Sequence, residues 1–256
     1  MQDVTQGVHP RNPRGNRSIR RPVRKRPGAM RRAAVADVLV GGTQVLATTL
    51  TAPVGRRRYN RWGATAAEVA EAMPGDELVP HPMLGYTRAI MIQAPPERVW
   101  PWLVQIGQGR GGFYSFDGLE NLAGCDIHSA DQVRPDLQDL AVGDLIRLGP
   151  AGYPCFRVDQ VAPGASLVLV GADPRPPHLA APPDSPAGIA TWQWQLRSTP
   201  DTQGTRLVTR QRLSYPPTTG MRVMWHLVEP VGFVMERQML RGIKQRVERN
   251  QGRGAS

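Results

Sequence analysis

Apolar and polar residues alternate over two segments in the last third of the chain, which predicts two long β-strands. The first segment, residues 189–198, places Trp192, Trp194 and Leu196 on one face. The second segment, residues 204–215, has an arginine-rich face made of Arg206, Val208, Arg210 and Arg212. We expect this arginine-rich face to contact solvent.

Four shorter apolar and β-branched runs, separated by glycine and proline, predict four more strands: residues 87–94, 144–149, 156–164 and 166–173. Helical spacing and capping signals predict helices over residues 66–73, 95–107, 114–124 and 219–250. The order is therefore a strand, two short helices, a run of strands and a long helix. This order is typical of an α+β fold rather than of alternating βαβ units.

The C-terminal helix carries an apolar stripe that is rich in methionine: Met224, Val228, Val231 and Met235, followed by Met239, Leu240, Ile243 and Val247. One interpretation is that the stripe packs against the sheet. The other is that its methionines and the two tryptophans of the first long strand line a cavity for an apolar ligand. The two interpretations are compatible, because one end of the helix can pack while the other covers a cavity.

An apolar segment near the N-terminus, residues 33–54, is flanked by arginines on both sides. Its 22 residues can just span a bilayer, but Asp37 makes that costly. We expect an interfacial or core-docked helix in preference to a transmembrane one. The predicted organisation is a disordered basic leader, an apolar helical segment, one domain and a disordered tail, over residues 1–32, 33–61, 62–250 and 251–256.

The net charge of +11 belongs to the N-terminal part of the chain. Residues 1–62 hold 14 basic and 2 acidic residues, whereas residues 63–256 hold 18 basic and 19 acidic residues. Such an asymmetry indicates an anionic partner for the leader alone, unless the leader is simply a solvated tail. A membrane surface contacted through residues 11–58 is the partner we expect. Nucleic acid bound through residues 11–32 is the other hypothesis, and it is not the expected one.

Three glycines, Gly107, Gly109 and Gly112, spell a G-x-G-x-x-G motif. A dinucleotide-binding loop of this kind must leave a strand and open a helix. Here the glycines follow the helix predicted over residues 95–107. We therefore expect them to adopt positive φ in a tight connection between two helices, and we expect no cofactor.

The run TRAIMIQAPPERVWPWLVQIG, residues 87–107, resembles the opening of the SRPBCC superfamily, which is the START-like, Bet v 1-like and polyketide cyclase group. The longer run from WGATAAEVAEAMPGDELVP to LAVGD is similar to a mostly actinobacterial subgroup of it. The resemblance covers about residues 62–250. It implies a helix-grip fold, in which a curved antiparallel sheet surrounds a long C-terminal helix above a deep hydrophobic cavity. Its members bind lipids, sterols or polyketides, and some catalyse aromatisation or cyclisation.

Tyr114 and Asp117 lie about one helical turn apart, and Glu120 extends the same face, so the three side chains can point into such a cavity. The residues expected to contact a ligand are Trp102, Tyr114, Asp117, Glu120, Trp192, Trp194, Met224, His226 and Met235. If the protein is an enzyme, its proton-transferring residues are expected among Tyr114, Asp117 and His128.

The pair Asp126 and His128 has the composition of an acid–base pair or of two metal ligands. No second histidine lies nearby in the sequence, so we expect no metal site. In the alternative interpretation, Asp126 and Asp131 cap local turns and His128 bonds to the backbone. The two cysteines, Cys125 and Cys155, lack the spacing of a zinc or redox motif, and we expect ordinary, partly buried thiols.

These patterns favour a protein that holds a small hydrophobic ligand between its sheet and its C-terminal helix. The first alternative is a polyketide cyclase or aromatase that uses the same cavity. The second is binding of nucleic acid or a membrane surface through the basic leader. We expect a cytoplasmic protein, with the option of membrane association through residues 33–54.

Overall fold

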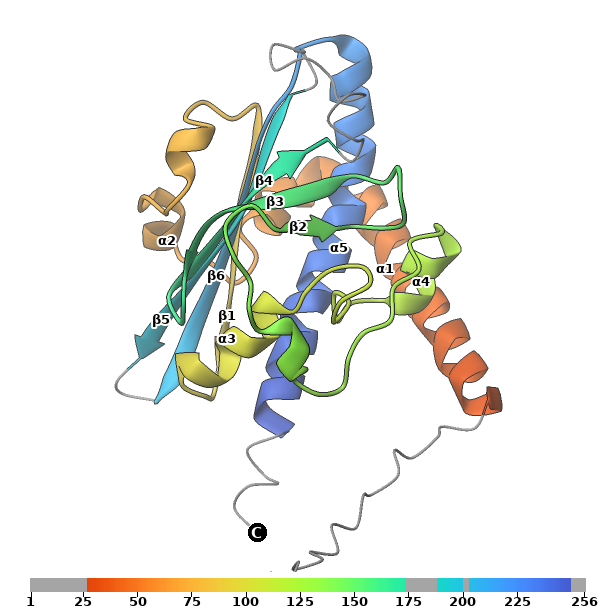
Figure 1. Cartoon of the computed structure of the whole chain (residues 1–256). Coiled ribbons are helices and arrows are strands. Elements are labelled where there is room, and N and C mark those ends of the chain that lie inside the picture. The colour runs from red at the N-terminus through yellow and green to blue at the C-terminus, as the bar shows by residue number, and fades with distance from the viewer. Residues whose placement is uncertain (1–26, 174–187, 200–202, 250–256) are drawn as a thin grey trace, which may run out of the picture.

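The computed structural model describes residues 27–173, 188–199 and 203–249, with side chains from residue 34 onward (Figure 1). Three parts of the chain lie outside the described residues: most of the predicted leader, the proline-rich residues 174–187, which contain His178, and the predicted tail.

Within the described residues, six strands form one antiparallel sheet in the order β1-β6-β5-β4-β3-β2. The strands are β1 (Leu84–Ile92), β2 (Leu145–Arg147), β3 (Cys155–Ala162), β4 (Ser166–Ala172), β5 (Ile189–Thr199) and β6 (Gly204–Ser214). Each lies where the apolar pattern predicts a strand. A register shift between Val158 and Gln160 marks an irregularity in β3 of the kind that increases twist.

The helices are α1 (Pro27–Asn60), α2 (Ala66–Ala70), α3 (Pro96–Val104), α4 (Asp117–Leu122) and α5 (Thr219–Arg249), with short 3-10 turns η1 (Asp76–Leu78) and η2 (Pro135–Leu137). Figure 1 shows α5 against one face of the sheet and α2 on the opposite face. Thr65 and Glu68 form a capping box at the start of α2. A curved antiparallel sheet around a long C-terminal helix is the helix-grip α+β fold that was predicted.

The two halves of α5 differ in their surroundings. In its C-terminal half the apolar side chains are buried against the sheet and α3: Met239, Leu240, Ile243 and Val247. In its N-terminal half apolar side chains remain exposed: Val223, Met224, Leu227, Val228 and Val231. The helix therefore packs at one end and leaves its other end available to border a cavity.

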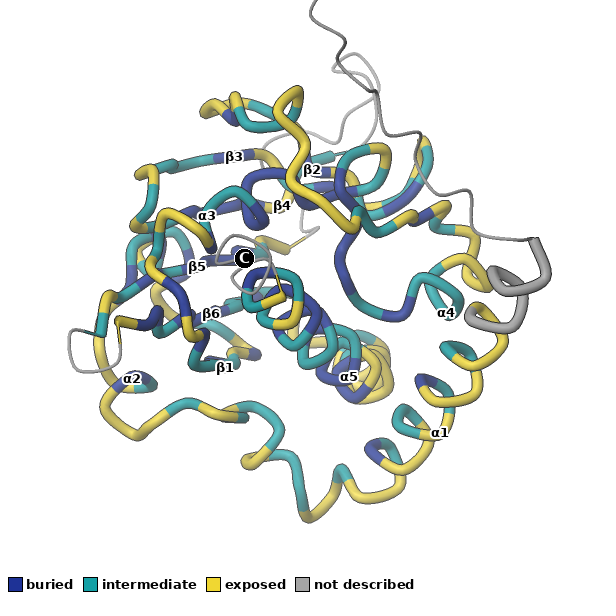
Figure 2. Tube along the Cα trace, turned by 90° about the horizontal axis from the view of Figure 1, so that it is seen from below, coloured by how far each residue is buried: buried dark blue, intermediate teal, exposed yellow. Residues whose placement is uncertain are grey.

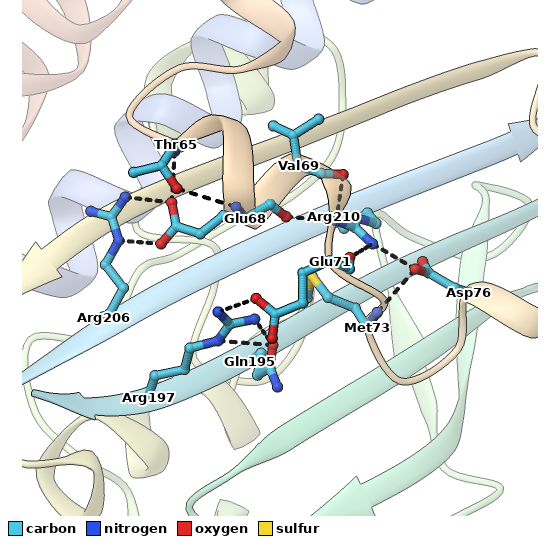
Figure 3. Close-up of polar contacts among 10 residues, drawn as sticks. All are labelled: Thr65, Glu68, Val69, Glu71, Met73, Asp76, Gln195, Arg197, Arg206 and Arg210. Atoms are coloured by element: carbon cyan, nitrogen blue, oxygen red, sulfur yellow. Dashed lines mark hydrogen bonds and ion pairs between the residues drawn. The ribbon is translucent and has the colours of Figure 1, made fainter.

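The arginine-rich face of β6 is largely covered by protein, so the prediction that it faces solvent is wrong. Residues 62–80 cover it, Val208 is fully buried, and Arg210 is only 6% exposed. The guanidinium of Arg210 bonds to the carboxylate of Asp76 at 2.5 Å and to the backbone carbonyl oxygen of Glu68 at 2.8 Å (Figure 3). Arg206 pairs with the same Glu68 at 2.6 Å, and this hydrogen bond lowers the pKa of Glu68 to about 2. The alternation of residues in β6 identified its arginine-rich face, but it did not show that residues 62–80 cover this face and pair with its charges.

The glycine motif forms the tight connection that was predicted between α3 and α4. Gly107, Gly109 and Gly112 have φ values of 122°, 72° and 71°. Backbone hydrogen bonds of 3.0 and 3.1 Å join Gly107 and Gly112 in both directions. A Cβ atom on Gly112 would lie 2.7 Å from the Cα atom of Ser129, so only glycine fits there.

Helix α1 lies along α5 and α4. Its outward side is exposed along most of its length (Figure 2). That side carries large apolar residues, among them Leu39 and Leu50, which are 63% and 72% exposed. The segment Ala34–Asn60 is long and apolar enough to cross a membrane by length and composition. In this structure it is a surface helix with one docked side and one unpartnered apolar side.

Candidate functional site

A cavity of about 1600 Å³ lies between the sheet, α4, α1 and the N-terminal half of α5. The sheet contributes Tyr86, Phe156, Trp192, Gln211 and Leu213, while the helices contribute Val45, Leu119, Glu120, Val228, Met235 and Glu236. Apolar side chains that line it are also exposed to solvent, namely Leu122, Ile189, Val228 and Val231. The cavity therefore opens at the molecular surface, and the residues at its opening are apolar.

Trp192 forms the aromatic centre of the cavity wall. Its ring lies 5.8 Å from that of Phe156 and 6.3 Å from that of Phe113, both of which line the cavity. On its other side it contacts Trp194, at a ring separation of 4.3 Å. Both indoles point to the inner face of the sheet, as the alternation predicts, but only Trp192 lines the cavity, because Trp194 is buried in the core.

A polar cluster interrupts this apolar wall at Glu236, which is 5% exposed. One carboxylate oxygen accepts hydrogen bonds from Trp192 Nε1 at 3.0 Å, Thr209 Oγ1 at 3.1 Å and Gln211 Nε2 at 3.2 Å. The other oxygen pairs with the guanidinium of Arg88, which is 1% exposed. A buried ion pair with this many donors to its carboxylate is well compensated for its loss of hydration.

Glu120 places a second carboxyl group in the cavity wall, on α4. Its Oε1 atom accepts a hydrogen bond from Ser115 Oγ at 2.6 Å. Its Oε2 atom is buried and has no hydrogen-bond partner among the described residues. Burial raises the pKa of Glu120 to about 7, and the nearby charge of Asp117 acts in the same direction, while the Ser115 bond opposes it. Burial, with Glu120 nearby, also raises the pKa of Cys125, which lines the cavity beside it.

Tyr114 and Asp117 do not line the cavity, and their side chains bond to other groups of the protein. Tyr114 is buried at a positive φ of 59°, and its hydroxyl group accepts from Gln105 Nε2 at 2.8 Å and donates to the backbone oxygen of Trp102 at 3.1 Å. Asp117 accepts from the backbone and hydroxyl groups of Ser129 at 2.7 and 2.6 Å. These contacts hold the loop between α3 and α4 in place.

The remaining predicted residues are spread over the molecule. Trp102 packs edge-on against the ring of Tyr114 in the core, at 5.6 Å. Met224 and His226 lie on α5 outside the cavity lining, where His226 contacts Arg56 at 3.4 Å. His128 lies on the surface with its side chain 81% exposed, 3.1 Å from Asp126. Of the predicted ligand contacts, the cavity brings together Glu120, Trp192 and Met235.

Sequence reasoning missed the polar cluster and the role of the cysteines in the cavity. Glu236 follows Met235 beside the apolar stripe of α5, and an acid at such a position is the signal that indicates a buried partner. Gln211 lies on the cavity-facing side of β6, as the alternation shows. Cys125 and Cys155 are free thiols, as expected, and both line the cavity. Within the described residues, no group of three or more His, Cys, Asp or Glu side chains is arranged to hold a metal ion.

Neither a family model nor a curated protein matches the sequence. Solved structures with a similar arrangement include protein MLL2253 from Mesorhizobium loti, with 19% identity over 64% of this chain and 97% of that chain, at a TM-score of 0.34. The Aha1 dimer from Colwellia psychrerythraea matches with 17% identity over 61% and 94% of the two chains, at 0.33. Ara h 8.0201 matches with 9% identity over 64% and 97%, at 0.35. The assignment of the fold rests on the strand order and on the position of α5.

Proposed function

We propose that this protein binds a small hydrophobic ligand in the cavity between its sheet and α5. The observation that supports this most directly is the cavity itself, whose volume of about 1600 Å³ exceeds the roughly 300–1,000 Å³ of ordinary ligand pockets. Its wall is mostly apolar, with a few polar groups at defined positions, which is the composition of sites that bind apolar molecules. A lipid-, sterol- or polyketide-like molecule matches this size and polarity.

The resemblance of residues 62–250 to the SRPBCC superfamily supports the same proposal. That group is expected to bind its ligands between the sheet and the C-terminal helix, which is where this cavity lies. Membership of the actinobacterial subgroup stays a prediction.

A polyketide cyclase or aromatase is the less supported alternative. Such an enzyme needs proton-transferring groups that converge on the substrate. Tyr114, Asp117 and His128, which were the expected candidates, do not line the cavity. The acidic groups that do line it within α4 and α5 are Glu120 and Glu236, and Glu236 is already held by its protein donors.

We also propose that the apolar outward side of α1 associates with an anionic membrane surface. Interfacial helices combine an apolar face with flanking basic residues. Here Leu39 and Leu50 are exposed, and the exposed Arg57 and Arg58 lie near the C-terminal end of the helix, whereas Arg56 is paired with Glu229 of α5. The basic leader adds positive charge at the other end, and each arginine near an anionic surface contributes about 1 kcal/mol.

Native mass spectrometry of the protein purified from its own host tests the ligand-binding proposal. We expect a population that carries a non-covalently bound molecule, which solvent extraction recovers as an apolar compound. Refolding the extracted protein and adding the compound back should restore the bound mass. A protein that is wholly ligand-free, and that takes up no apolar compound from host lipid extract, would contradict the proposal.

A further inference from the structure

We infer that the ligand is an uncharged apolar molecule with a hydroxyl or carbonyl group, and that Glu120 binds this group at the α4 end of the cavity. This inference rests on the proposed ligand-binding function and specifies the chemical class of the ligand. It is carried by the charges in the cavity wall and by one unpartnered oxygen atom.

The charged side chains in the cavity lining are all acidic. They are Glu120, Asp173 and Glu236, and no lysine, arginine or histidine lines the cavity among the described residues. A ligand carboxylate or phosphate transferred here would therefore lose its hydration with no cationic side chain in this lining to replace it, because Arg88 behind the wall is already paired with Glu236. Such a transfer is strongly unfavourable in a poorly hydrated site. The wall thus disfavours anionic amphiphiles such as fatty acids.

The two cavity carboxyl groups on α4 and α5 differ in what their oxygen atoms already bind. Both oxygens of Glu236 are engaged, one by Arg88 and the other by Trp192, Thr209 and Gln211. Glu120 has one engaged oxygen, which accepts from Ser115, whereas Oε2 is buried without a partner among the described residues. A buried polar atom that makes no hydrogen bond is unfavourable, because it has lost its hydration without replacement. A ligand group that bonds to this oxygen, once the carboxyl group turns toward the cavity that Glu120 lines, removes this cost.

The titration of Glu120 determines which ligand groups it can bind. The ionisable groups around it are Asp117 on the same helix and Cys125 just after it, while Asp37 on α1 interacts with Asp117 and Glu236 lines the cavity from α5. The charge of Asp117 favours the neutral form of Glu120, as burial does. A neutral carboxyl group donates to a carbonyl oxygen and also accepts from a hydroxyl group, whereas a carboxylate only accepts. A ketone should therefore bind best below neutral pH, whereas an alcohol should bind to Glu120 in both of its protonation states.

Displacement of the neutral dye Nile red by 2-dodecanone, 1-dodecanol and dodecanoate tests this inference. The proteins to compare are the full-length wild type, Glu120→Gln and a control, Asp126→Asn, whose carboxylate is exposed and outside the cavity. From pH 6 to pH 8.5 the affinity of the wild type and the control for the ketone should fall about fivefold, which corresponds to one lost hydrogen bond. Glu120→Gln should show no such fall, because its amide donates at every pH. At pH 8.5 the wild type should bind dodecanol at least about tenfold more tightly than dodecanoate.

The outcomes separate this inference from the proposal on which it rests. If Nile red binds but ketone affinity has the same pH dependence in the wild type and in Glu120→Gln, the role of Glu120 is overturned and ligand binding stands. If dodecanoate binds as tightly as dodecanol, the uncharged ligand class is overturned. If no variant binds Nile red or any of the three probes, the proposed function itself fails. Because the pH profile of the wild type alone tests the ketone prediction, the result does not depend on the folding of a variant.

Discussion

Replacing Glu120 by Gln should change how the stability of this protein depends on pH. The pKa of Glu120 is raised from 4.5 to about 7 in the folded protein, chiefly by burial. Between these values the unfolded chain releases the proton while the folded chain keeps it, so the folded state loses stability as pH rises. Glutamine does not titrate and has no such penalty.

The magnitude follows from the two pKa values. A pKa of about 7 against 4.5 corresponds to about 3 kcal/mol in full, of which about 2.5 kcal/mol develops between pH 5 and pH 8. The free energy of unfolding of Glu120→Gln, minus that of the wild type, should therefore increase by about 2.5 kcal/mol over this interval.

Urea denaturation followed by tryptophan fluorescence at pH 5, 6, 7 and 8 measures this difference, because groups that titrate alike in the two proteins cancel. Asp126→Asn is the matched control, and its stability should follow the wild type in parallel. Parallel curves for Glu120→Gln and the wild type would show that Glu120 titrates normally, and the reasoning about its buried site would be refuted.

Three further predictions follow from the same structure. Glu236→Ala should destabilise the fold by about 3–5 kcal/mol, because it leaves Arg88 buried without its partner. Adding Arg88→Met should recover part of this loss. If urea denaturation shows that the loss in the double variant equals the sum of the losses in the two single variants, the prediction is contradicted. Arg210→Met should cost about 3 kcal/mol, since it releases residues 62–80 from the sheet, and a change below about 1 kcal/mol in urea denaturation would argue against that clamp. Replacing Leu39 and Leu50 together by Glu should abolish co-sedimentation with vesicles of phosphatidylglycerol and phosphatidylcholine while leaving the melting temperature within about 3 °C, because both side chains are exposed. Unchanged sedimentation would exclude this side of α1 as the contact.

The secondary structure was predictable because each strand and helix carries its own local signal. Trp192 and Trp194 alternate with polar residues in β5, and both point inward. The conformation of the glycine loop was predictable because the loop follows a helix, whereas a nucleotide-binding loop follows a strand and begins a helix. Such signals depend only on residues that are close together in the sequence, so the sequence of one protein is enough to read them.

The site was harder to predict because it depends on which segments meet in space. Tyr114 and Asp117 share a short stretch with Glu120, yet Ser129 and Gln105 hold the first two away from the cavity and leave only Glu120 in its wall. The same limitation explains the arginine-rich face of β6. Its charges are typical of a surface strand, and only the position of residues 62–80 shows that acids cover them.

The central claim is that the interior contains an apolar cavity large enough for a ligand, and a pair of glycines on α5 tests it directly. Gly232 lines the cavity and Gly220 does not, and a Cβ atom at either position meets no atom within 4 Å. Replacing Gly232 by Trp should weaken Nile red binding about fivefold, because an indole there displaces the ligand from about 40 Å² of apolar wall. Gly220→Trp should bind the dye like the wild type. Equal affinities in all three proteins would contradict a ligand site in this cavity.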